Sequence, residues 1–168
     1  MYDVPAVLSD ILGVDFKLRA LGANNLYAGC ERAPMHVDYP YLLYGYEGKP
    51  MPAEHLEMQL ILMVDAFTSE NGGTRVWEGS QLRRENPYVS QHESIALFEE
   101  HCRAIEGDAG TLVIATGLIW HQSGKNVTPH GRLGLLGQYV RGDVCEHSSR
   151  TYDDEVLARC PYPSKVQW

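Results

Sequence analysis

The most regular pattern of hydrophobic and polar positions in this chain lies between residues 56 and 64. The odd positions begin with Glu57, Gln59, Ile61 and Met63, whereas the even positions are all apolar: Leu56, Met58, Leu60, Leu62 and Val64. An alternation with a period of two predicts a β-strand whose two faces meet different surroundings. We therefore expect the even face to pack in a core and the odd face, which carries Gln59, to line a wet cavity.

Turn-forming residues divide the rest of the chain into short segments. Turns are predicted at residues 69–73 and 107–110, because their glycines adopt positive φ at little cost. Further strands are predicted over residues 74–78, 111–115, 118–121 and 132–141, with short helices over residues 4–12 and near 94–101. Many short strands and few helices predict a mainly β sandwich or barrel, and 168 residues suffice for one domain over residues 1–168.

Charge and composition exclude several classes of protein. A net charge of −8 lacks the basic footprint of a nucleic-acid binder, and the longest apolar stretch, at residues 60–64, is too short to cross a membrane. The start of the chain has no basic or long apolar segment, so we expect no signal peptide. The four cysteines form no Cys-x-x-Cys pair, which favours free thiols in the reducing cytoplasm. Cys145 and His147 are half of a zinc site at most, because no second half lies nearby.

His36-Val-Asp38 is the first candidate metal site. On an extended chain, residues i and i+2 project to the same face, so an imidazole and a carboxylate can converge on one ion. Two histidines and a carboxylate form the ligand set of non-haem Fe(II) oxygenases. Chance alone gives about one such pair in a chain of this composition, and His55-Leu-Glu57 is a second match. The pattern by itself leaves both pairs open.

His121 and Arg132 supply further candidate chemistry. Arg132 opens the apolar strand predicted over residues 132–141, eleven residues after His121. An arginine at the start of a core strand needs an anion, because an unpaired buried charge is costly, and its planar guanidinium matches a carboxylate. Gly134 shares its face and leaves room beside it. Taken singly, the histidine is more often a hydrogen-bonded polar residue, and the arginine more often a surface or salt-bridged one.

These segments resemble, in order and spacing, the phytanoyl-CoA dioxygenase-like (PhyH) family of Fe(II)/2-oxoglutarate-dependent oxygenases. The similarity runs from about residue 24 to residue 141. Its most specific part is Asp65-Ala-Phe-Thr-Ser-Glu-Asn-Gly-Gly-Thr-Arg-Val-Trp-Glu-Gly-Ser80, which resembles the family's D-x-T-x-E-N-G … P-G-S-H stretch. Gly107-Asp-Ala-Gly-Thr-Leu and His121-Gln-Ser-Gly-Lys-Asn126 also match. The resemblance implies a double-stranded β-helix, a cupin-like jelly roll with few short helices.

The resemblance also implies roles for individual residues. His36, Asp38 and His121 would bind Fe(II), Arg132 would bind the C5 carboxylate of 2-oxoglutarate, and Ser123 matches a position that helps to hold that carboxylate. Weaker matches to positions that line the cosubstrate pocket are Gln59, Thr74 and Asn25. The implied enzyme is a dioxygenase that uses O₂ to oxidise a small-molecule substrate, most simply by hydroxylation, and releases succinate and CO₂. A carboxylate at position 38 favours an oxygenase over the related halogenases, which have a small residue there.

Three departures from the family pattern leave alternatives open. Gln81 stands where the family usually has His, Glu78 stands where it usually has Pro, and the region before the cavity-lining strands is short. The chain is alternatively a β-sandwich binding module, or a catalytically degenerate or fragmentary oxygenase that binds metal or ligand without turnover. The substrate is not indicated. The tyrosines after the metal motif would either line an aromatic substrate pocket or be ordinary half-buried residues: Tyr39, Tyr41, Tyr44 and Tyr46.

The short N-terminal helix also bears on assembly. Residues 4–12 give only about two and a half helical turns, too few to cover the apolar face of the strand over residues 56–64. Either the irregular segment 81–101 covers that face, or a second copy of the chain does. Because large exposed apolar patches are rare on monomers, we expect a homodimer.

Overall fold

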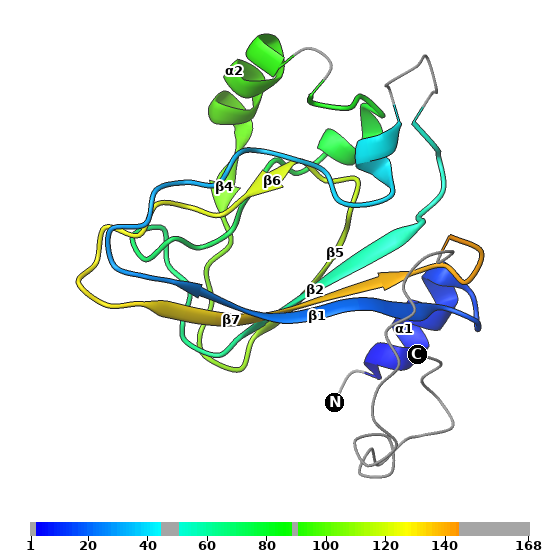
Figure 1. The fold of residues 1–168 in the computed structure, drawn as a ribbon, viewed down its shortest axis with the longest axis horizontal. Helices are drawn as coiled ribbons and strands as arrows, with labels where there is room; N and C mark the ends of the chain where they lie inside the picture. The colour runs from blue at the N-terminus through cyan, green and yellow to red at the C-terminus, as the bar shows by residue number, and fades with distance from the viewer. Residues whose placement is uncertain (1–2, 45–50, 89–90, 145–168) are drawn as a thin grey trace.

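Two antiparallel sheets face each other in the computed structural model, which describes residues 3–44, 51–88 and 91–144 (Figure 1). The larger sheet has the order β1 (Lys17–Leu26), β7 (Arg132–Val140), β2 (Glu57–Met63) and β5 (Leu112–Thr116). The smaller sheet has the order β4 (Arg103–Ala104), β3 (Arg75–Val76) and β6 (His121–Gln122). This arrangement confirms the predicted mainly β jelly roll.

Helix α1 (Val4–Leu12) packs against the outer face of the larger sheet. The helix begins where Asp3 accepts a hydrogen bond from the Ala6 amide, with proline in the first turn. Leu8 and Leu12 then pack against Met58 and Leu60, the even positions of β2. The even face is therefore a core face at Met58 and Leu60, where the short helix covers it. Leu62 is half-buried, however, and Val64, also predicted to lie in the core, is 40% exposed.

The odd face of β2 points between the two sheets. Glu57 is fully buried at one end of the strand, and Ile61 and Met63 pack with Phe67 near the other end. Gln59 lies between them and is also buried. The predicted wet cavity therefore occupies only the middle of this face.

The segment after the metal motif is tied to the start of β2 by Tyr41. This residue lies in the 3₁₀ helix η1 (Tyr41–Leu43) and is fully buried. Its hydroxyl accepts hydrogen bonds from the Leu56 and Glu57 amides and donates to the Glu54 carbonyl at 3.2 Å. Tyr41 is therefore a core residue. Tyr39 and Tyr44 line a separate cavity of about 490 Å³, and Tyr46 lies outside the described residues.

Several elements differ from the sequence predictions. Strand β1 was not predicted, because its glycine and two asparagines disfavour a strand. It forms because it pairs along its whole length with β7, an interaction that local sequence does not record. Helix α2 (Gln91–His101) begins before the predicted residue 94, within the segment expected to be irregular. The strand predicted over residues 118–121 is reduced to β6, because a turn precedes it.

Two exclusions drawn from composition can be compared with the structure. None of the helices in the described ranges is long and apolar enough to cross a membrane. Cys30 and Cys102 carry free thiols. The half-site at Cys145 and His147 lies outside the described residues.

Candidate active site

Backbone pairing brings His36, Asp38 and His121 together from distant parts of the chain. His36 and His121 form an isolated antiparallel bridge, in which each amide donates to the other residue's carbonyl at 2.9 and 3.0 Å. The Asp38 amide donates to the Gly117 carbonyl at 2.9 Å. The motif at residues 36–38 therefore runs beside the segment that ends in His121, and its i and i+2 side chains point the same way.

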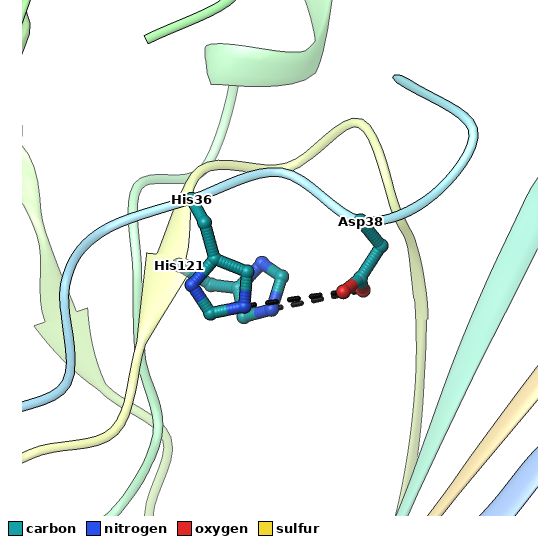
Figure 2. A group of neighbouring side chains, drawn as sticks. All are labelled: His36, Asp38 and His121. Atoms are coloured by element: carbon teal, nitrogen blue, oxygen red, sulfur yellow. Dashed lines mark ion pairs between the residues drawn. The ribbon is translucent and has the colours of Figure 1, made fainter. Parts of the chain in front are cut away.

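The three side chains converge on one point (Figure 2). The Nε2 atoms of His36 and His121 lie 3.9 and 3.7 Å from the two Asp38 oxygens, and the imidazole centroids are 4.2 Å apart. All three candidate ligand atoms lie within 4.8 Å of one another. Among the described residues, this is the only cluster of His, Cys, Asp or Glu side chains with such a geometry.

Both imidazoles are oriented by backbone carbonyls. His36 Nδ1 lies 2.9 Å from the Pro34 carbonyl, and His121 Nδ1 lies 2.9 Å from the Ile119 carbonyl. A carbonyl only accepts, so Nδ1 carries the proton and the Nε2 lone pair faces Asp38. Burial lowers the pKa of His121, which favours the neutral imidazole that binds metals.

The Asp38 carboxylate is buried and only half satisfied. Its Oδ1 atom accepts a hydrogen bond from Gln138 Nε2 at 3.2 Å, whereas Oδ2 has no hydrogen-bond partner. A buried carboxylate oxygen without a donor is destabilising unless a cation is bound to it. The residues present therefore fit a metal ion between the two histidines and Asp38.

The rival pair His55 and Glu57 does not form a metal site in the structure. His55 is exposed and hydrogen-bonds to Thr116 Oγ1 at 3.1 Å, whereas Glu57 is fully buried and neither of its oxygens has a hydrogen-bond partner. Burial and the nearby Asp38 carboxylate raise the pKa of Glu57 well above its ordinary value, which favours a neutral carboxylic acid. A side chain at Gly117 would clash with Glu57, so this glycine makes room for the acid.

Arg132 is a buried cation that contacts no carboxylate of the described residues. It is 2% exposed, its Nη2 donates to the Gly72 carbonyl, and its Nε has no partner. Burial lowers the pKa of Arg132, and the charge of Asp65 acts against this, but Asp65 uses its own Oδ2 to accept from the Leu133 amide at 2.8 Å. An anion bound beside Arg132 would satisfy both the charge and the free N–H.

One cavity of about 170 Å³ joins the histidines to Arg132. Three of the four other predicted cosubstrate positions line it, namely Ser123, Gln59 and Thr74. Asn25 does not: it is exposed, and its neighbour Asn24 lines the cavity instead. The one-residue error reverses the side, because successive side chains of β1 point to opposite faces.

Two polar residues around the site were not singled out from the sequence. Asn126 is fully buried and donates to the Leu26 and His130 carbonyls at 3.0 and 2.8 Å, which fixes the loop that leads into Arg132. Gln138 contacts Asp38 directly. Neither position carried a local signal, because an amide in a loop or strand has no distinctive spacing.

The chain matches the sequence profile of the family described as phytanoyl-CoA dioxygenase (PhyH) over residues 15–134. It belongs to the PhyH family. The match spans most of the chain and includes His36, Asp38, His121 and Arg132. Membership confirms the resemblance seen in the sequence, and the family consists of non-haem Fe(II)/2-oxoglutarate dioxygenases.

Relatives of known sequence are much longer than this PhyH chain. An uncharacterized protein of Mycobacterium tuberculosis, Rv1501, is 28% identical over 106 residues, which cover 63% of this chain and 34% of the relative. The dioxygenase af480 of Aspergillus fumigatus is 27% identical over 132 residues, which cover 77% and 38%. The chain therefore spans about a third of the length of the curated relatives that it matches.

Solved structures show the same fold at low sequence identity. EctD from S. alaskensis with bound Fe has a TM-score of 0.63 at 18% identity, covering 82% of this chain and 49% of EctD. HygX from Streptomyces hygroscopicus with iron bound has a TM-score of 0.64 at 12% identity, covering 82% of this chain and 63% of HygX. These likenesses establish the shared PhyH-type jelly roll.

The two sequence departures from the PhyH pattern lie outside the cavity lining. Gln81 belongs to the 3₁₀ helix η3 (Ser80–Leu82), where its Oε1 accepts from the Gly79 amide at 3.0 Å. Glu78 is exposed and pairs with Arg103. Both residues therefore have local structural contacts, and neither removes a donor from the site.

Proposed function

We propose that this chain is an Fe(II)- and 2-oxoglutarate-dependent dioxygenase that oxidises a small-molecule substrate and releases succinate and CO₂. The observation that carries the proposal is a single cavity bounded by two oriented imidazoles at one end and a buried, carboxylate-free arginine at the other. A dicarboxylate cosubstrate would meet a metal at one end and Arg132 at the other.

The roles of the residues follow from their contacts. His36, Asp38 and His121 would hold Fe(II), because two neutral imidazoles and one carboxylate are the ligand set of this class of oxygenase. Arg132 would bind the far carboxylate of 2-oxoglutarate, and Ser123, Gln59 and Thr74 would line its path. Bound iron supplies the redox chemistry that couples 2-oxoglutarate decarboxylation to substrate oxidation by O₂.

Structural neighbours support this choice of cofactor and cosubstrate. EctD has been solved with Fe and, separately, with 2-oxoglutarate and 5-hydroxyectoine, and HygX has been solved with iron. The shared fold and the cluster of His36, Asp38 and His121 favour the same pair of ligands here. The similarity to EctD and HygX concerns the fold, so it does not indicate a substrate for this chain.

A turnover assay separates the enzyme from a protein that binds ligands without catalysis. Protein loaded with Fe(II) and 2-oxoglutarate without O₂ is exposed to air, and succinate is measured with and without candidate small molecules. We expect slow succinate release without substrate, faster release with a true substrate, and none from Asp38→Ala. Iron and 2-oxoglutarate binding without any succinate would instead favour the degenerate, binding-only alternative.

A further inference from the structure

Gln138 on β7 holds Asp38 through one of its two carboxylate oxygens, the one that lies 3.9 Å from His36 Nε2. The Gln138 amide nitrogen donates to Asp38 Oδ1 at 3.2 Å. Oδ2, which lies 3.7 Å from His121 Nε2, receives no hydrogen bond. One carboxylate oxygen is therefore committed to the protein, and the other is left for the centre of the cluster.

Arg19 determines which end of the Gln138 amide faces Asp38. Arg19 Nη1 donates to Gln138 Oε1 at 2.8 Å. An arginine side chain only donates and an ionised carboxylate only accepts, so an amide between them satisfies both in a single orientation. Without Arg19, the amide could turn by a half rotation and place its oxygen against the carboxylate.

A β-bulge in β1 places Arg19 in this position. The β1–β7 register passes from Leu18 opposite Tyr139 to Ala20 opposite Gln138, so Arg19 is the extra residue. Bulges of this kind re-aim side chains next to functional sites. The Arg19 guanidinium also lies 4.2 Å from the ring centroid of Tyr39, the residue after Asp38.

Arg19 forms no ion pair among the described residues, although its charge acts on the buried Glu57 and lowers the pKa of that acid, against the larger rise that burial causes. Within residues 3–44, 51–88 and 91–144, its only side-chain hydrogen bond goes to the neutral Gln138 amide. The arginine is half-buried, so holding it in one place costs side-chain entropy. Orienting the amide gives a physical reason for that placement.

We propose that Arg19 and Gln138 are positioning residues for the metal-binding carboxylate. Arg19 fixes the amide of Gln138, and Gln138 holds Asp38 with Oδ2 directed to the metal. This inference rests on the proposed function, because it requires a metal ion at His36, Asp38 and His121.

Metal affinity tests the contacts from Arg19 to Gln138 and from Gln138 to Asp38, called the relay below, without any turnover. Fe(II) and Co(II) are titrated anaerobically into purified wild-type, Gln138→Leu and Arg19→Met proteins. We expect Gln138→Leu to weaken binding by about 10–100-fold, the usual effect of losing an outer partner of a metal ligand. Arg19→Met should weaken binding as well, and the visible spectrum of bound Co(II) should change in both variants.

The sign of the Arg19→Met effect separates positioning from simple electrostatics. Removing a cation near a metal site should tighten metal binding if the charge acts only through space. Tighter or unchanged binding would therefore overturn the relay. The double variant should bind metal no more weakly than Gln138→Leu alone, because Arg19 acts through Gln138, and additive losses would also contradict the proposal.

Controls guard against general effects of the substitutions. Arg103→Met removes an exposed arginine outside the site and should leave metal affinity unchanged. Arg19→Lys keeps the charge and one donor, so it should bind metal more tightly than Arg19→Met. A lysine variant as weak as the methionine variant would count against the relay.

A metal-free measurement judges the relay separately from the proposed function. If wild-type protein binds no metal, the proposed function fails. The side-chain amide signal of Gln138 in the ¹⁵N spectrum, assigned by its loss in Gln138→Leu, still reports the relay. We expect this signal to shift or broaden in Arg19→Met. In Arg19→Lys the signal should remain close to that of wild type. An unchanged signal in Arg19→Met would overturn the inference.

Discussion

The guanidinium of Arg132 stacks on the ring of Phe67, with its central carbon 3.8 Å from the ring centroid. Gly134 makes the stack possible, because a side chain there would come within 2.8 Å of the Phe67 ring. Stacking fixes the plane of the guanidinium without using its N–H groups. Arg132 is therefore oriented in advance for an anion in the cavity.

Replacing Arg132 by leucine should weaken 2-oxoglutarate binding and leave iron binding nearly intact. A charge-assisted bidentate contact contributes roughly 1.5–3 kcal/mol, so affinity should fall at least about tenfold. The measurement is an anaerobic titration of 2-oxoglutarate into Fe(II)-loaded protein, followed by its charge-transfer absorption. Arg141→Leu is the matched control, since Arg141 pairs with Asp143 outside this cavity. Identical curves for Arg132→Leu and wild type would mean that the arginine is structural.

Removing the Asp38 carboxylate should remove most of the metal affinity. Losing an outer partner of a ligand already costs about 10–100-fold, so Asp38→Ala should cost more than about 100-fold. His55→Ala should have no effect, because His55 is exposed and bonded to Thr116. Anaerobic Fe(II) titration measures both variants. Equal losses in the two variants, or none in either, would contradict the assignment.

Glu57 should make the metal-free protein less stable as pH rises. Its folded-state pKa is raised well above 4.5, so the folded protein holds a proton that the unfolded chain loses. The free energy of unfolding therefore falls as pH climbs from about 4.5 towards the folded pKa. Glu57→Gln removes this dependence. The melting temperature of the variant, relative to that of wild type, should therefore be a few degrees higher at pH 8 than at pH 5 (~2–4 °C per kcal/mol).

Thermal melts of both metal-free proteins across that pH range provide the measurement. Glu99→Gln is a useful comparison, because Arg75 lowers the pKa of Glu99 and its contribution is lost only below about pH 4.5, so its difference from wild type should stay constant between pH 5 and pH 8. A constant difference between Glu57→Gln and wild type at every pH would show that the buried acid is not linked to folding.

The homodimer expected from the sequence remains a prediction. Helix α1 covers Met58 and Leu60, but Leu21 and Leu112 on the same sheet are 56% and 40% exposed. If a second copy of the chain buries Leu21 and Leu112, Leu112→Glu should shift the protein towards the monomer. Leu82→Glu, at an exposed position elsewhere, should not. Light scattering at micromolar concentration distinguishes these outcomes. A wild-type protein of 18.8 kDa that does not associate would rule the dimer out.

Local sequence determined the principal chemistry of the candidate site. The i, i+2 spacing of His36 and Asp38 needs only an extended backbone to place both side chains on one face. Arg132 at the head of an apolar strand already indicated a buried charge in need of an anion. The alternation in β2 likewise predicted a strand with a core face and an inward face, because side-chain direction in a strand repeats every two residues.

Long-range pairing decided what the sequence left open. The choice between His36-x-Asp38 and His55-x-Glu57 depended on which pair lies beside His121, and the backbone bridge from His36 to His121 settles that geometry. That Asn24 rather than the predicted Asn25 lines the cavity depends on the register of β1 against β7. The contact of Gln138 with Asp38 joins residues 100 positions apart, and that of Arg19 with Gln138 joins residues 119 positions apart, the latter at a bulge in β1. Such contacts arise from sheet register, and register is fixed by the packing of the whole sheet, so no short stretch of sequence encodes it.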